Sequence, residues 1–82
     1  GIQLYPNPAQ TVAFLDLTAV ADETVDIQIL DQTGRMVKML HFDYAPAGAT
    51  TLELRNLPTG VYFVKVQTAT QQLVERLLIQ QW

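Results

Sequence analysis

Polar and apolar residues alternate with a period of two along most of this chain, and this spacing is its strongest constraint on folding. Residues 24–31 read TVDIQILD, which places Val25, Ile27 and Ile29 on one face. The run 61–68, VYFVKVQT, alternates in the same way. Side chains of a β-strand point to opposite faces in turn, whereas a helix repeats about every 3.6 residues. The pattern therefore predicts half-buried strands.

Turn residues separate these runs. Residues 31–35, DQTGR, place Gly34 where a hairpin turn closing into a bulge needs a positive φ. Pro58-Thr59-Gly60 suits a type I turn. The last run, LVERLLIQ at 73–80, also fits an amphipathic helix, but it follows a strand closely and lacks a cap, so we interpret it as a strand. We expect strands at residues 2–5, 12–19, 24–31, 35–42, 50–56, 60–68 and 72–80.

Seven short strands without a helix predict an all-β fold, an antiparallel sandwich of two sheets. A closed barrel with fewer strands is the alternative. The 82 residues fit one domain, and a second domain does not fit.

Composition excludes several classes of function. Five basic residues against eight acidic ones argue against nucleic acid as a partner. The chain has no cysteine and no serine, which rules out disulfides, thiolate metal sites and the corresponding nucleophiles. It also has no apolar run of about 20 residues, so we expect no transmembrane segment, and its start does not resemble a signal peptide.

Residues able to carry chemistry are few, and we expect no enzyme, no cofactor and no metal. His41 is the single histidine, which suits an ordinary residue at a strand end better than a ligand or a catalytic base. Two sets of carboxylates could in principle carry chemistry. One could form a weak calcium site but suits a solvated loop better, and the other could form a glycosidase pair, for which a small sandwich leaves little room. The first set is Asp22, Glu23 and Asp26, and the second is Asp16, Glu53 and Glu75.

Aromatic residues offer one further possibility, a platform on which sugars stack, although in a small sandwich such residues usually form the core. They are Phe14, Phe42, Tyr44, Tyr62, Phe63 and Trp82.

Four motifs follow one another in a specific order. They are LYPNP at 4–8, VDIQILDQTGRMV at 25–37, LELRNLPTGVYFVKV at 52–66, and LVERLLIQ at 73–80. In this order and spacing they resemble the type IX secretion system C-terminal sorting domain of type A, the Por secretion tail family. The resemblance extends from Leu4 to about Ile79. One departure is the ending Gln80-Gln81-Trp82, since family members commonly finish with a lysine or with few residues after the closing strand.

Individual residues of this chain match the family pattern. The matched positions that we expect to be recognised by the export machinery are Tyr5, Pro6, Asn7, Pro8, Gly34, Gly60, Tyr62, Arg76, Leu77, Leu78 and Ile79. Further matches are Asp31, Arg35, Leu57, Val64 and Val66.

The resemblance implies an immunoglobulin-like sandwich that serves export. Similar domains end secreted proteins of Bacteroidetes, which enter the periplasm by an ordinary N-terminal signal. Their partners are an outer-membrane translocon and a sortase, which often removes the domain, and the cargo is fused upstream. Residues 1–82 would then be one C-terminal sorting domain of a secreted or cell-surface protein. The alternative is an immunoglobulin-like or fibronectin-like accessory module of an extracellular enzyme or adhesin, which binds carbohydrate or acts as a spacer.

The two ends of the chain suggest how recognition works. Proline fixes its own φ and keeps the preceding residue extended, so residues 1–8 form a stiff lead-in from linker to sandwich, or simply hold an edge strand straight. The closing strand Leu73–Gln80 is expected at a sheet edge, open to a strand of the translocon or to a second copy. Arg76 would supply a charged contact and Leu77–Ile79 an apolar one, unless Leu77 and Ile79 belong to the core.

Overall fold

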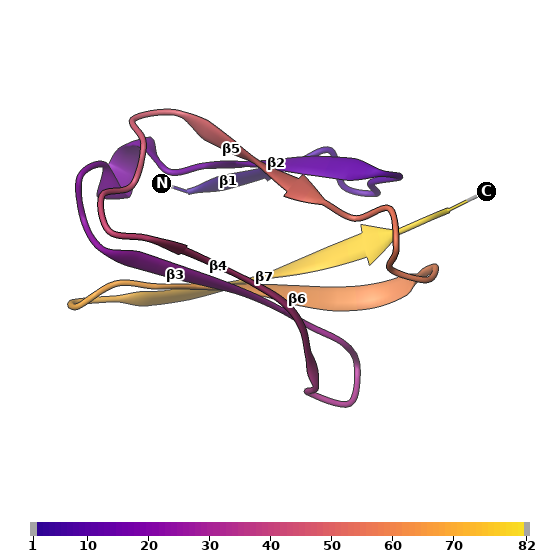
Figure 1. Ribbon diagram of the computed structural model, residues 1–82. Helices are drawn as coiled ribbons and strands as arrows, with labels where there is room; N and C mark the ends of the chain where they lie inside the picture. Colours follow the sequence, from indigo (N-terminus) through magenta and orange to yellow (C-terminus); the bar gives the residue numbers. More distant parts are fainter. Residues whose placement is uncertain (1, 82) are drawn as a thin grey trace.

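The computed structural model describes residues 2–81, which form two antiparallel sheets packed face to face (Figure 1). The three-stranded sheet has the order β1 (Gln3–Tyr5), β2 (Val12–Asp16), β5 (Ala49–Glu53). The four-stranded sheet has the order β4 (Met36–Phe42), β3 (Val25–Leu30), β6 (Gly60–Gln67), β7 (Gln72–Ile79). These pairings confirm the predicted sandwich of seven strands.

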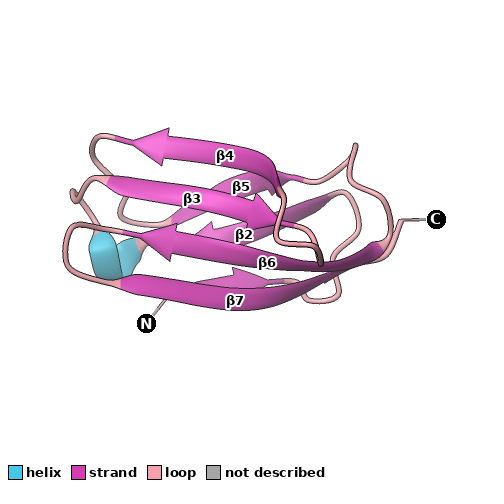
Figure 2. Cartoon of the chain, turned by 90° about the horizontal axis from the view of Figure 1, so that it is seen from below, coloured by secondary structure: helices cyan, strands magenta, loops and turns pink. Residues whose placement is uncertain are grey.

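The connections are those of an immunoglobulin-like sandwich. Two hairpins, β3–β4 and β6–β7, lie within the four-stranded sheet, whose face is seen in Figure 2. The chain crosses between the sheets after β2, after β4 and after β5. β3 pairs with β6, so the two hairpins meet at the centre of the sheet. The edges of this sheet are therefore β4 and β7.

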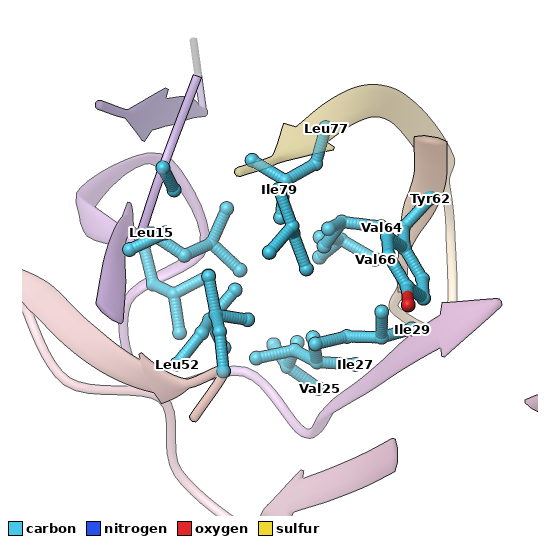
Figure 3. Close-up of a cluster of buried hydrophobic side chains, with 14 of the residues drawn as sticks. Leu15, Val25, Ile27, Ile29, Leu52, Tyr62, Val64, Val66, Leu77 and Ile79 are labelled. Carbon is cyan, nitrogen blue, oxygen red and sulfur yellow. The ribbon is translucent and has the colours of Figure 1, made fainter. Parts of the chain in front are cut away.

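The core lies between the sheets and follows the alternation of the sequence. Leu15 and Leu52 from one sheet point toward Ile27, Ile29 and other apolar side chains of the facing sheet (Figure 3). Burying a leucine or isoleucine contributes about 1.5–3 kcal/mol. Among the described residues the core contains no buried charged or polar side chain. Hydrophobic burial is therefore the main source of stability.

The predicted hairpin at 31–35 is confirmed. Gly34 adopts φ = 85°, and its N–H donates to the Asp31 carbonyl oxygen at 3.0 Å. The Asp31 carboxylate accepts hydrogen bonds from the Thr33 hydroxyl at 2.6 Å and the Arg35 N–H at 3.0 Å. The bond from Thr33 lowers the pKa of Asp31 below its ordinary value. The turn is therefore held by one charged side chain as well as by glycine.

Two strands, β2 and β5, end three residues earlier than the sequence predicts. The strand expected to reach residue 19 stops at Asp16, because the Asp16 carboxylate accepts a hydrogen bond from the Thr18 N–H at 2.9 Å. One turn of 3-10 helix, η1 (Thr18–Val20), follows and leads to the other sheet. The strand expected to reach residue 56 stops at Glu53, since a hydrogen bond from the Leu57 N–H to the Leu54 oxygen closes a turn before the predicted turn at Pro58.

The described residues contain no helix long enough to span a membrane.

Candidate recognition surface

The LYPNP segment passes from one sheet to the other along the side of the sandwich. Leu4 and Tyr5 belong to β1 and pair with β2 in the three-stranded sheet. Four residues later, Ala9 forms a parallel bridge with Ile79 at the edge of β7. Its N–H donates to the Leu78 oxygen at 2.9 Å, and its oxygen accepts from the Gln80 N–H at 2.8 Å. The segment thus joins both sheets.

Asn7 binds the same edge through its side chain. The Nδ2 group donates to the Arg76 oxygen at 2.7 Å, and Oδ1 accepts from the Leu78 N–H at 3.0 Å. These are the groups that a neighbouring strand would otherwise bind. An asparagine side chain carries a donor and an acceptor side by side, so it can pair as a peptide group does. Asn7 and Ala9 together cover the C-terminal half of the β7 edge.

Tyr5, Pro6 and Pro8 face the solvent next to this contact. The Tyr5 ring lies against Phe14 of β2, with ring centroids 5.7 Å apart. Beside this pair lies an open hollow of about 420 Å³, which contains no charged side chain. Its lining residues are Pro6, Pro8, Gln10, Thr11, Val12 and Phe14.

The closing strand divides its side chains between the core and the surface. Leu77 and Ile79 are completely buried, so neither is accessible in the folded domain. Arg76 is exposed and Leu78 is half-buried, and both point to the outer face of the four-stranded sheet. Of the closing-strand residues expected in recognition, only Arg76 and Leu78 therefore reach the surface.

Three other residues expected to be recognised lie in a turn, at a strand start and in the core. Gly34 is in the hairpin turn, and Gly60 begins β6. Tyr62 is 6% exposed, and its hydroxyl donates to the Pro58 oxygen at 2.7 Å. Burial raises the pKa of Tyr62 above its ordinary value. This bond fixes the loop before β6 to the core.

The residues considered for catalysis or metal binding are not brought together. Asp16 and Glu53 lie at opposite ends of the β2–β5 ladder, and Glu75 belongs to the other sheet. Within residues 2–81 no group of three or more acidic, histidine or cysteine side chains is placed to hold a metal ion. The aromatic side chains are also dispersed, since Tyr62 is buried and Tyr44 is 78% exposed in a loop. Trp82 lies outside the described residues, as does Gly1.

His41 has a more specific position than the sequence indicates. Its Nδ1 atom lies 2.7 Å from the Asp26 carboxylate on β3, and its Nε2 atom lies 2.9 Å from the Asp43 carboxylate. The hydrogen bond with Asp26, and then that with Asp43, raises the pKa of His41 above its ordinary value. The imidazole therefore joins two strands and a loop on the exposed face.

Sequence reasoning missed the contacts of two residues near the two ends of the chain, Ala9 and Gln81. Ala9 acts through its backbone, which gives no signal in its residue type. Gln81 Nε2 donates to the Leu54 oxygen at 2.9 Å, and the Gln81 N–H donates to the Thr59 hydroxyl at 2.9 Å. Gln81, which follows the closing strand, is thus packed against the loop before β6.

A comparison with protein families matches residues 3–80 to the model of the secretion system C-terminal sorting domain. The matched region includes all seven strands and the contacts of Asn7 and Ala9 with β7. No curated protein matched the chain.

Proposed function

Because the chain belongs to the family of type IX secretion system C-terminal sorting domains, we propose that residues 1–82 act as one C-terminal sorting signal for cargo fused upstream. The observation that carries this proposal is the family match over residues 3–80, nearly the whole chain. Membership in the family implies interaction with the secretion machinery. It also implies export across the outer membrane to the cell surface or the medium.

We also propose the steps by which the cargo is exported. The cargo reaches the periplasm by its own N-terminal signal, and the translocon of the outer membrane then binds the folded sandwich. A sortase-type peptidase removes the domain and releases the cargo or attaches it to surface lipopolysaccharide. The domain itself performs no chemistry in this scheme. The separation of its carboxylates and the engagement of its single histidine support that assignment.

Recognition is proposed to use the surface where the LYPNP segment meets the closing strand β7. Tyr5, Pro6 and Pro8 are exposed on one side of it, and the exposed Arg76 and the half-buried Leu78 lie on the other. Asn7 connects the two sides through its hydrogen bonds to the backbone of Arg76 and Leu78. Of the remaining expected residues, Tyr62, Leu77 and Ile79 belong to the core that supports this surface, whereas Gly34 and Gly60 lie in the β3–β4 turn and at the start of β6. Residues 1–8 serve as the lead-in from the cargo linker, and Asn7 together with Ala9 covers the C-terminal half of the β7 edge.

A secretion assay tests this function. A fluorescent protein with an N-terminal export signal and residues 1–82 at its C-terminus is expressed in a bacterium that has a type IX system. We expect fluorescence on the surface or in the medium, and loss of export when Leu73–Trp82 is removed. Folded fusion retained in the periplasm would contradict the proposal and favour an accessory module.

A further inference from the structure

The outer edge of β7 is open along its N-terminal half. β7 pairs with β6 on one side only. In an antiparallel pair, the backbone groups of alternate residues face the partner strand. The groups of Leu78 face away from β6, since Asn7 and Ala9 bind them, and by alternation those of Val74 and Gln72 face the same way. Within residues 2–81 neither residue has a hydrogen-bond partner on that side.

The cover formed by Asn7 and Ala9 sets the limit of the open stretch. It binds the oxygens of Arg76 and Leu78 and the N–H groups of Leu78 and Gln80. The Arg76 N–H and both groups of Val74 remain available. An unpaired strand edge is a template for another extended chain.

Charged side chains flank this stretch without counter-charges. Arg76 is exposed on the outer face, where Lys65 of β6 lies opposite Val74. Glu75 points to the other face. None of the three forms an ion pair within the described part of the chain. The outer face beside the open edge is thus basic, in a chain whose net charge is −3.

We infer that Gln72–Arg76 accepts an extended segment of the export machinery as an added strand. Its backbone would bind the Val74 N–H and oxygen and the Arg76 N–H, and an acidic side chain on its outer face would meet Arg76 and Lys65. The inference rests on the proposed function. It adds that the partner binds through an extended segment that carries an acidic residue.

A second copy of the chain fits this edge less well. Antiparallel pairing about a two-fold axis at Val74 would place Gln72 opposite Arg76 and Leu73 opposite Glu75, so both charges would stay without a counter-charge. The shared ladder would be about 17 Å long. It would involve only the five residues Gln72–Arg76 of each copy, against the roughly 20–30 residues per partner of a stable interface.

The test uses Val74→Pro in the cargo fusion, with Val74→Thr as its matched control. Proline removes the outward N–H but no bond to β6, and it is tolerated at the open side of an edge strand. We expect export of the proline variant to fall about tenfold, as for one or two lost hydrogen bonds, and the threonine variant to be exported normally. Circular dichroism and urea unfolding of the domain check that both variants fold.

Crosslinking keeps the inference testable if Val74→Pro does not fold. A photoreactive residue replaces Gln72 at the open edge or, as the control, Gln32 in the β3–β4 turn, both of which are exposed. We expect a crosslink from position 72 to an outer-membrane protein and none from position 32.

Three results would overturn the inference. Equal export of a folded Val74→Pro variant and its threonine control would remove the strand-acceptor role and leave the sorting function intact. A crosslink from position 72 to a second copy would show that this edge pairs with another copy of the chain and not with the export machinery. Failure of the unsubstituted fusion to be exported would overturn the sorting function and this inference together.

Discussion

The side-chain oxygen of Asn7 accepts a hydrogen bond of 3.0 Å from the backbone N–H of Leu78, across 71 positions of the chain. Its amide nitrogen donates to the Arg76 oxygen at 2.7 Å on the same strand. One side chain thus supplies β7 with the donor and the acceptor that a neighbouring strand would offer. This pairing turns two motifs from opposite ends of the sequence into one surface.

Replacement of Asn7 by alanine should weaken the domain. Both hydrogen bonds are lost, and at about 0.5–1.5 kcal/mol each the free energy of unfolding should fall by about 1–3 kcal/mol. Urea unfolding measures the change. Gln10→Ala is the control, because Gln10 is exposed and has no hydrogen bond within residues 2–81; it should stay within about 0.5 kcal/mol. Equal effects of the two substitutions would show that the pairing does not stabilise the fold.

The hydroxyl of Tyr62 should contribute measurably to stability. Tyr62→Phe keeps the buried ring but leaves the Pro58 oxygen without its donor at 2.7 Å. We expect the free energy of unfolding to fall by about 1–2 kcal/mol. Tyr44→Phe is the matched control, because Tyr44 is 78% exposed and its hydroxyl has no protein partner among the described residues. A loss as large for Tyr44→Phe would contradict the role of the hydrogen bond.

His41 should make stability depend on pH. Its pKa is raised above 6.5 in the folded domain, first by the hydrogen bond with Asp26 and then by that with Asp43. The stabilisation is therefore complete below about pH 6.5 and is lost as the pH rises through the raised pKa. Thermal unfolding from pH 6 to about pH 9 should show the melting temperature falling more in the unsubstituted domain than in His41→Gln. Parallel curves would exclude a stabilising role of the imidazolium.

The local elements were predictable because they depend on neighbours in sequence. Alternation in 24–31 places Val25, Ile27 and Ile29 inside, and all three are buried. Gly34 marks the hairpin because few other residues adopt its positive φ. The end of β2 was missed because the side chain of Asp16, and not an apolar pattern, turns the chain there.

The composition of the recognition surface was less predictable, because it depends on pairings between distant residues. The prolines of LYPNP indicate an extended segment, but nothing in the motif says that Asn7 binds the backbone of β7. Period-two alternation in 73–80 separates Leu77 and Ile79 from Arg76 and Leu78. It does not say which set is buried until the register with β6 is known.

Arg76 and Leu77 are neighbours on β7 that should separate recognition from folding. Leu77 is fully buried, so Leu77→Ala should cost about 2–5 kcal/mol. That is a large part of the roughly 4–12 kcal/mol expected for a chain of this length. Arg76 is exposed and meets Asn7 only through its backbone, so Arg76→Ala should change stability by less than about 0.5 kcal/mol.

Export of the cargo fusion should fall for both substitutions, but for different reasons. Arg76→Ala should give a folded fusion that stays in the periplasm, with the urea midpoint of the unsubstituted domain. Leu77→Ala should give a fusion that proteases degrade, because more of the domain is unfolded. If Arg76→Ala is exported as well as the unsubstituted fusion, the guanidinium is not read by the translocon. Recognition would then have to depend on Tyr5, the two prolines and Leu78.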